Sequence, residues 1–261
     1  MIDYSFSMYE LEYLLLVIAR VASFVFVAPF FSMPNTPRRF KAAVSIFIAS
    51  LLYFTMFPHY RLEYSSVIEY SILVIRESAT GLIIGLGASI CTGITLFAGR
   101  LVDMNIGLAM ANEYDPTTRQ QTSVSGVLYN YLVMLVLMTT NFHHYLLRAL
   151  KQSYDLIPVN GMVFNTDKLV SAIVKFMGDY INLGFQLSLP IFAVILITNC
   201  ILGIMAKVAP QMNMFAVGMQ IKLLIGLGAM FLTINLLPYM ADLVYDEMRI
   251  MVVTFVKAMM P

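Results

Sequence analysis

The sequence predicts an all-α, multi-helix integral membrane protein, and two observations support this prediction: its composition and the placement of its charges. Of the 261 residues, 60% are hydrophobic and 12% are charged, whereas an ordinary soluble domain carries about a quarter charged residues. Long stretches lack any charged side chain and reach the length of about 20 apolar residues that a membrane-spanning helix needs. The net charge of +1 comes without a clustered basic stripe, so nucleic acid is not an expected partner.

Turn-forming residues separate the apolar stretches. Pro34 and Pro37 follow the first stretch, Pro116 closes a polar segment near the middle of the chain, and Pro158 marks a later turn. Because no soluble domain or long linker interrupts the pattern, residues 1–261 are expected to form a single membrane domain. The predicted apolar helices, about six in all, cover residues 12–33, 42–57, 68–98, 123–146, 170–206 and 213–240.

The last segment of the chain, residues 241–260, has a different character. It is less apolar and carries charged side chains of both signs, a composition typical of an amphipathic helix that lies on a membrane surface or against partner subunits. The charged residues that define this segment are Asp242, Asp246, Glu247, Arg249 and Lys257.

Charged residues within or beside the apolar runs are candidates for a specific role. Arg20 would either pair with an acidic group of a neighbouring subunit or extend its stem to the membrane interface, and the sequence favours neither. Glu77 follows Arg76 and is expected at a solvated helix start, with a partner's basic group as the alternative. Arg100 and Asp103 are three residues apart, which predicts a local ion pair on one helix face; a carboxylate in a proton relay is the alternative.

No residues form a catalytic or metal-binding motif, so neither an enzyme activity nor a metal or cofactor is expected. His143 and His144 are adjacent, whereas two metal ligands on one helix need a spacing of three or four residues. The two histidines are instead expected at a helix end, in contact with water or lipid headgroups. Cys91 and Cys200 lie in apolar runs without the spacing of zinc ligands, and both are expected to be buried.

Two polar segments, residues 112–116 and 207–213, interrupt the apolar helices. Non-helical backbone at membrane depth requires protein or a water-filled cavity around it, so these segments would either line a pathway or form ordinary surface loops. Methionines are frequent around both segments, and their flexible side chains would either form a deformable seal around a conduit or simply fill the core. These methionines are Met104, Met110, Met205, Met212, Met214 and Met219.

A motif of polar residues, glycines, one proline and one phenylalanine lies near the end of the chain. They are Asn199, Gly203, Lys207, Pro210, Gln211, Asn213 and Phe215, followed by Gly218, Lys222 and Gly226. This pattern resembles the C-terminal signature of the FliR family, the flagellar members of the FliR/SctT export-gate subunits of type III secretion. The resemblance extends over nearly the whole chain.

Earlier motifs also resemble those of this family. Arg20 matches its N-terminal pattern, and Asp103, with Asp115 and Pro116, matches its central loop. A further motif, Asn141, His143 and His144, looks like the Asn-Gly-His-His motif of the family, with Phe142 in place of the glycine.

The resemblance implies a structural subunit without catalysis or cofactor. In this family, one chain joins FliP-like and FliQ-like subunits, and an FlhB-like switch protein is a further expected partner. The helices pack as hairpins in a hetero-oligomeric export gate in the bacterial cytoplasmic (inner) membrane, at the flagellar basal body. Unfolded flagellar proteins pass through the pore of this gate. A secondary transporter of a small solute is the alternative function.

The resemblance also implies a gating role for the central loop, which helps to plug the closed pore in such proteins. The corresponding residues here are Met110, Asn112, Glu113 and Tyr114. Glu113 departs from the apolar or aromatic residues that the family often carries at this loop. Sealing would therefore fall to Met110 and Tyr114 together with neighbouring subunits.

Overall fold

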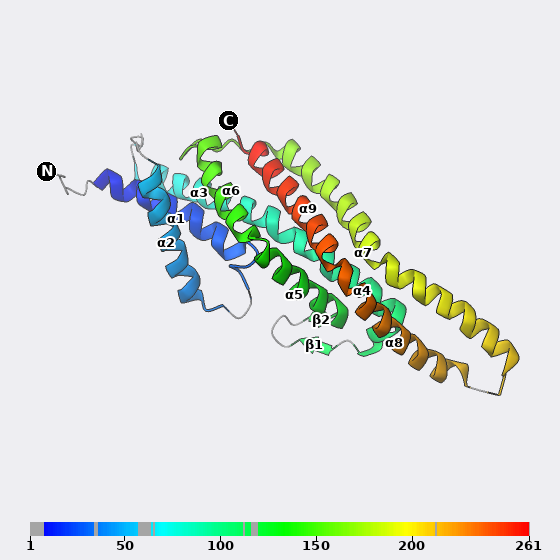
Figure 1. The fold of residues 1–261 in the computed structure, drawn as a ribbon. Helices are drawn as coiled ribbons and strands as arrows, with labels where there is room; N and C mark the ends of the chain where they lie inside the picture. The colour runs from blue at the N-terminus through cyan, green and yellow to red at the C-terminus, as the bar shows by residue number, and fades with distance from the viewer. Residues whose placement is uncertain are drawn as a thin grey trace. The chain divides into compact units, whose positions relative to one another are not determined.

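A computed structural model describes residues 8–33, 36–56, 64, 66–111, 113–115, 120–211 and 213–260, with residues 110–111, 113–115, 120–122 and 214 described by their backbone alone. Helices dominate the described chain, which confirms the predicted all-α fold (Figure 1). In chain order, the α-helices are α1 (Met8–Val27), α2 (Arg38–Thr55), α3 (Val67–Ser89), α4 (Gly93–Ile106), α5 (Val124–Thr139), α6 (Phe142–Leu156), α7 (Thr166–Val208), α8 (Met214–Leu232) and α9 (Leu237–Ala258).

Short elements connect some of these helices. The 3₁₀ turns η1 (Ile90–Thr92), η2 (Leu108–Ala111) and η3 (Thr233–Leu236) follow α3, α4 and α8. Two short strands, β1 (Glu113–Asp115) and β2 (Gln120–Thr122), pair in antiparallel orientation, with Glu113 opposite Thr122. The sequence predicts only a polar loop at this place.

Several helices have the length and composition of membrane spans, which agrees with the predicted membrane protein. Within the described residues, three helical stretches are long and apolar enough to cross a bilayer, or four if α5 and α6 count as one bent span. The three stretches cover Val67–Ile106, Thr166–Val208 and Phe215–Ala258. Neither α1 nor α2 is among them, so fewer spans are found than the apolar stretches suggest.

The chain divides into two compact units. The first contains residues 1–90, 142–174 and 248–261, and the second contains residues 91–141 and 175–247. Both α7 and α9 contribute residues to each unit. The organisation of residues 1–261 as a single domain stays a prediction.

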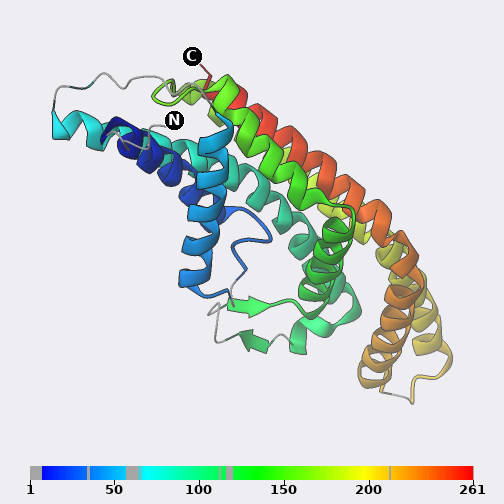
Figure 2. The same ribbon diagram turned by 60° about the vertical axis from the view of Figure 1, so that its left-hand side comes forward.

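The first unit is built around α1, which packs against α2 and α3 (Figure 2). Its buried positions recur with the period of an amphipathic helix, since Tyr13, Leu16, Arg20 and Phe24 all lie on its inner face. Helix α3 begins at an N-cap, because the Ser66 hydroxyl accepts a hydrogen bond from the Glu69 N–H at 3.3 Å.

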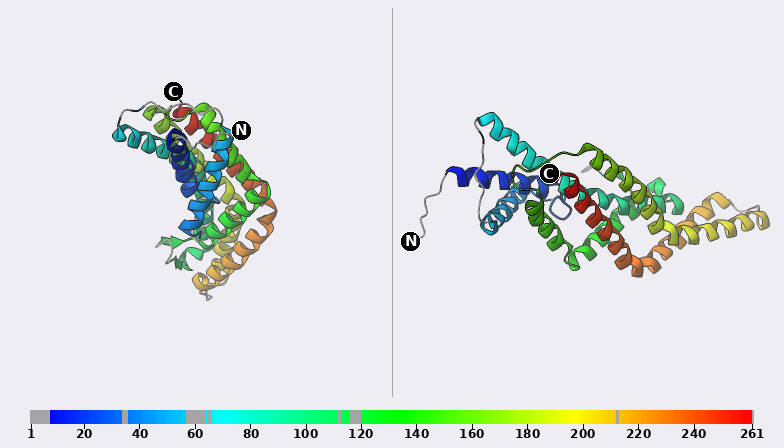
Figure 3. Two further views of the ribbon diagram at one scale, coloured as in Figure 1. Left: turned by 90° about the vertical axis from the view of Figure 1, so that its left-hand side faces the viewer. Right: turned by 90° about the horizontal axis from the view of Figure 1, so that it is seen from above.

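The second unit combines α4 and α5 with parts of α7 and α8. Its core contains side chains from all four helices: Val102, Ile106, Tyr129, Ile191, Ile195, Ala229 and Met230. The end of α7 and the start of α8 run side by side as a helical hairpin (Figure 3). Gly226 allows α8 to pack closely on α4, because a Cβ there would collide with the Ile106 side chain on α4.

Three predicted helices are interrupted. The 3₁₀ turn η1 divides the stretch 68–98 into α3 and α4, and the other two breaks have a local reason. The apolar stretch 123–146 breaks at Asn141, whose φ of 61° ends the helical course between α5 and α6. The stretch 213–240 ends early, because α8 stops at Leu232 and α9 starts at Leu237. Pro238 explains this last break: it lacks an N–H and its ring opposes the carbonyl four residues earlier, so an uninterrupted α-helix is disfavoured.

Candidate functional site

A buried ion pair fixes the centre of the first unit. Arg20 Nε donates to Glu77 Oε2 at 2.6 Å and Arg20 Nη2 donates to Glu77 Oε1 at 3.0 Å, and neither side chain has exposed surface. The guanidinium also donates to the Ile157 carbonyl at 2.9 Å and lies 4.1 Å from the ring centroid of Tyr154. Glu77 Oε1 in turn accepts the backbone N–H of Asn160 at 3.0 Å. The pair therefore ties α1 and α3 to α6 and the turn that follows it.

These contacts correct two interpretations of the sequence. Arg20 does not extend to the membrane interface and does not pair with an acidic group of another subunit, because Glu77 of the same chain neutralises it. Glu77 is not solvated at a helix start but completely buried in the middle of α3. Tight packing of α1 on α3 makes this possible, since Gly81 lies against the Arg20 carbonyl where any Cβ would collide.

In the second unit, Asp103 anchors both ends of the central segment, residues 107–122. Asp103 is 1% exposed, and its Oδ2 accepts a hydrogen bond from the Ser123 hydroxyl at 2.6 Å. Its Oδ1 accepts the Ser125 N–H at 3.3 Å, at the start of α5. The Asp103 carbonyl accepts the N–H of Gly107, which ends α4 with a φ of 89°. Asp103 thus contacts both ends of the segment: its carbonyl binds the first residue, and its carboxylate binds the two serines that follow the segment.

Asp103 therefore does not form the local ion pair that its spacing from Arg100 predicts. Its carboxylate is bound by Ser123 and Ser125, and the Arg100 side chain is exposed. Sequence reasoning missed both serines. A usable signal was present, since Ser123 directly precedes an apolar run and its hydroxyl caps α5 by accepting the Gly126 N–H at 2.9 Å.

The candidate plug residues lie in the segment that Asp103 anchors. The backbone of Met110 belongs to η2, and Glu113, Tyr114 and Asp115 form β1. Asn112 and Pro116 lie outside the described residues. The antiparallel pairing of β1 with β2 turns the segment back toward the start of α5.

The Asn141 motif forms the break between α5 and α6. Asn141 adopts the positive φ, and Phe142 is the first residue of α6. Phe142 is buried and contacts the rings of Phe30 and Tyr145 with centroid distances of 6.0 and 5.5 Å. A phenylalanine is therefore accommodated where the FliR motif has glycine, because its neighbour Asn141 provides the left-handed conformation.

The two histidines begin α6 in contact with each other. Their ring centroids are 4.1 Å apart, and His144 is exposed while His143 is half-buried. This agrees with the expected helix end.

Cys91 is buried as expected, whereas Cys200 is exposed on α7, which corrects that expectation. The expected absence of a metal or cofactor stays a prediction.

The late motif surrounds the turn between α7 and α8. Lys207 lies in the last turn of α7, Pro210 and Gln211 are exposed in the connection, and Asn213 caps α8 by accepting the Ala216 N–H at 3.4 Å. Gly203 on α7 has no atom of a neighbouring residue within 4 Å of its Cβ position.

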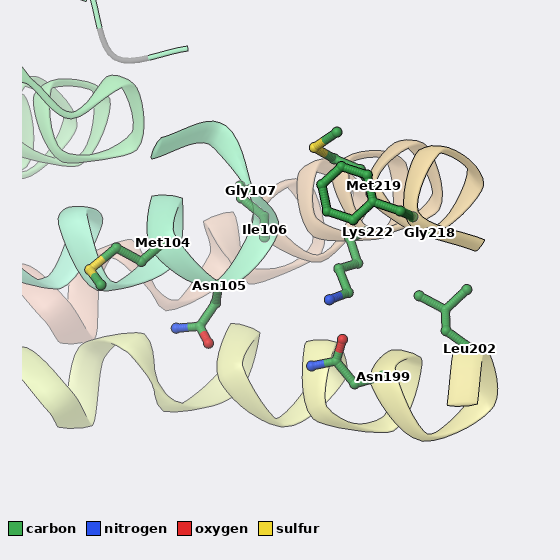
Figure 4. Close-up of a pocket in the computed structure, with 10 residues that line it drawn as sticks. Met104, Asn105, Ile106, Gly107, Asn199, Leu202, Gly218, Met219 and Lys222 are labelled. Carbon is green, nitrogen blue, oxygen red and sulfur yellow. The ribbon is translucent and has the colours of Figure 1, made fainter. Parts of the chain in front are cut away.

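Several motif residues meet at a pocket of about 310 Å³ in the second unit. Lys222 on α8 points toward Asn199 on α7, and Asn105 on α4 extends into the same space (Figure 4). The pocket adjoins Gly107, where the central segment begins. Its remaining lining is mostly apolar and comprises Met104, Ile106, Leu202, Phe215, Gly218 and Met219. Part of the late motif thus lines one pocket beside the start of the central segment, namely Asn199, Phe215, Gly218 and Lys222.

Fold and site together define a multi-pass helical membrane protein with a firmly anchored segment between two of its helices. Residues 11–248 match the model of the family described as "Bacterial export proteins, family 1", and the chain belongs to this family. Proteins of this family are components of bacterial export, and this chain is therefore a secretion component.

The curated relatives carry flagellar names. The chain is 29% identical to the "Flagellar biosynthetic protein FliR" of Bacillus subtilis (strain 168) over 211 residues, which cover 80% of this chain and 81% of the relative. It is also 29% identical to that of Aquifex aeolicus (strain VF5) over 86% of both chains. Identity to that of Escherichia coli (strain K12) is 23%, over 87% of this chain and 86% of the relative. The resemblance to the FliR family seen in the sequence is thereby confirmed.

Proposed function

We propose that this chain is a structural subunit of the flagellar type III protein export gate in the bacterial cytoplasmic membrane, at the flagellar basal body. It joins FliP-like and FliQ-like subunits and contacts an FlhB-like switch protein, and the assembly forms the pore through which unfolded flagellar proteins cross. It performs no catalysis and needs no cofactor. The match to bacterial export proteins over residues 11–248 supports this role most and favours it over transport of a small solute.

Apolar surface that the chain leaves uncovered supports assembly with other subunits. In the spans 166–208 and 215–258, only 22% of the most apolar window is buried within the chain. Gly178, Gly203 and Gly228 have no neighbouring atom within 4 Å of their Cβ positions. Small residues on an open face let another helix approach closely. Lipid chains do not require small residues on the face that they cover. Helices of partner subunits are therefore the better explanation of these faces.

Closing of the pore belongs, in this proposal, to the central segment. Met110 and Tyr114 supply an apolar constriction together with neighbouring subunits, and Asn112 and Glu113 lie between them in the sequence. A hydrophobic constriction blocks ions by excluding water. Anchoring of the α5 end of the segment by the Asp103 carboxylate supports this role, because a plug must return to one position after each passage.

Co-purification tests the proposed function. The tagged chain is produced together with its FliP-like and FliQ-like partners and isolated from membranes in a mild detergent. We expect a stable complex that contains both partners, because the packing faces of this chain are shared with them. Isolation of a stable lone chain that binds a small solute would replace the proposal with a transporter.

A further inference from the structure

Lys222 brings a positive charge into an otherwise mostly apolar pocket. It lies in the span Phe215–Ala258, eight residues after the start of α8, and its side chain is half-buried. Its ammonium group extends toward Asn199 (Figure 4). In the described part of the chain, the one ion pair with an N···O distance within 4.0 Å is that of Arg20 with Glu77. Lys222 therefore has no carboxylate partner among these residues.

A lysine in a membrane span requires compensation. Ionisable side chains at membrane depth are costly, and they pair with one another or face a polar cavity. The two asparagines that share the pocket offer amide groups but no negative charge. They can form hydrogen bonds with a ligand in the pocket, but they do not neutralise the charge of Lys222. The Asn105 amide is already bonded in part, because its Nδ2 donates to the Leu101 carbonyl at 2.6 Å. Among the side chains that the structure describes, none supplies an anion to this pocket.

The pocket is accessible to another helix. Asn199 is exposed, and Asn105 and Lys222 are half-buried, so the polar groups face outward and not into a closed core. Phe215 and Leu224, on either side of Lys222 along α8, are 73% and 75% exposed. Gly218 removes bulk one turn before the lysine. An apolar helix can cover this face and place one acidic side chain opposite Lys222.

We propose that this pocket, lined by Asn105, Asn199 and Lys222, receives the carboxylate of an Asp or Glu on an apolar helix of a neighbouring subunit. This inference rests on the proposed function, because it requires an assembly. Charge complementarity selects the carboxylate, and the exposed apolar side chains around it select a membrane helix as its carrier. The pocket thus sets the register of one partner helix against α8.

A zero-length cross-link tests the contact directly. The assembly is purified intact and treated with dicyclohexylcarbodiimide, an apolar reagent that enters membrane regions. The reagent activates a carboxylate; the Lys222 amine then forms an amide bond, and one carboxylate oxygen leaves within dicyclohexylurea. Mass spectrometry of the peptides identifies what is linked to Lys222. We expect an Asp or Glu from an apolar helix of another subunit.

Substitutions at Lys222 measure the contribution of the contact. Lys222→Met should lower recovery of the partner subunits by about tenfold or more, because it leaves the partner's carboxylate unpaired. Lys222→Arg keeps the charge and should retain most of the recovery. Lys151→Glu is the control, since Lys151 is exposed on α6 and does not line the pocket. Lys222→Glu should also lose the partners, and a reciprocal acid-to-lysine change at the cross-linked residue should restore them.

The outcomes separate this inference from the proposed function. If wild-type protein recovers its partners, but Lys222 stays unlinked and Lys222→Met recovers them equally, the inference is wrong and the export-gate role stands. If Lys222→Met keeps its partners but no longer carries a bound anionic phospholipid, the inference is also wrong, and the ligand of the pocket is a lipid. If the wild type recovers no partners, the proposed function fails first and the inference fails with it.

Discussion

Arg20 and Glu77 carry opposite charges in the interior of the first unit, and each satisfies the other through two hydrogen bonds. The geometry is bidentate, which is the strongest arrangement for a guanidinium and a carboxylate. The carbonyl of Ile157 and the N–H of Asn160 complete the network. A pair of this kind holds three parts of the chain in register, and loss of either member leaves the other charge buried alone.

Replacement of Arg20 by methionine should destabilise the chain strongly. The unpaired Glu77 carboxylate would remain buried, and breaking a buried pair in this way costs about 3–5 kcal/mol. The measurement is thermal unfolding of the purified protein in detergent. The double variant Arg20→Met with Glu77→Met should recover part of the loss, because no buried charge is left.

Arg76→Met is the matched control for this prediction. Arg76 neighbours Glu77, but it is exposed and its Nη1 reaches only Asn160 Oδ1, at 3.4 Å. We expect a change of less than about 1 kcal/mol, as for other exposed polar contacts. Equal unfolding temperatures for Arg20→Met and Arg76→Met would contradict the structural role of the buried pair.

Substitution of Asp103 by asparagine tests the anchor of the central segment. The Ser123 hydroxyl and the Ser125 N–H would lose a charged acceptor, which costs about 1–3 kcal/mol. Because these groups start α5, hydrogen exchange of the first amides of α5 and proteolysis within residues 107–122 should both become faster. Thr139→Ala is the control, since its hydroxyl bonds only within α5, to the Val136 carbonyl at 2.8 Å. Unchanged exchange in Asp103→Asn would show that other contacts hold the segment.

At the scale of whole elements, close helix contacts depend on glycines. Gly99 on α4 lies against the backbone of Gly126 on α5, and a Cβ at Gly99 would collide with the Gly126 N and Cα atoms. Backbone atoms cannot move aside as a flexible side chain can, so the two helices would have to separate. This contact sets the spacing of α4 and α5, and therefore the distance between the two ends of the central segment.

Gly99→Ala should therefore destabilise the second unit, although alanine is the better helix former. We expect a loss of about 1–3 kcal/mol from overpacking, measured as thermal unfolding in detergent. Gly178→Ala is the control, because no neighbouring atom lies within 4 Å of its Cβ position on α7. That change should raise stability by about 0.5–1 kcal/mol. A stabilised Gly99→Ala variant would mean that α4 and α5 are not packed this closely.

The repeat of apolar residues predicts some elements of the fold but not the contacts or breaks that depend on other features. Helix α1 is predictable because its buried positions follow a local repeat. The partner of Arg20 is not predictable, because Glu77 is 57 residues away in the sequence and only the packing of α1 on α3 brings them together. The break at Asn141 is missed for a different, local reason, since a single residue with positive φ does not change the hydropathy pattern.

The candidate site was predictable in its residues but not in its arrangement. The motif residues Asn199, Phe215 and Lys222 stand out in the sequence, and the structure brings them to one pocket. Asn105 joins them from α4, and no spacing rule connects it to the late motif. Asp103 stands out in the sequence as a charged residue in an apolar run, whereas its bonds to Ser123 and Ser125 depend on the fold of the second unit.

On the scale of the whole molecule, the chain leaves a large part of its apolar span surface uncovered, as the exposed side chains of Ile204, Leu224 and Phe231 illustrate. In the proposed gate, partner subunits cover this surface and share the closure of the pore with this chain. In this proposal the central segment closes the pore, because Asp103 anchors it and it carries Met110 and Tyr114. Its side chains should therefore control leakage through the assembly.

Met110→Ser and Tyr114→Ser should make the closed assembly leak ions. A serine at either position is smaller and binds water, so a constriction that excludes water by apolar contact would become wet. The measurement is ion conductance of the purified complex in planar bilayers, without export substrate. Met177→Ser is the control, because Met177 is 49% exposed on α7 and lies outside the segment. Unchanged conductance in both segment variants would show that Met110 and Tyr114 do not form the plug. Leakage in these variants but not in the control would assign closure of the pore to the segment that Asp103 anchors.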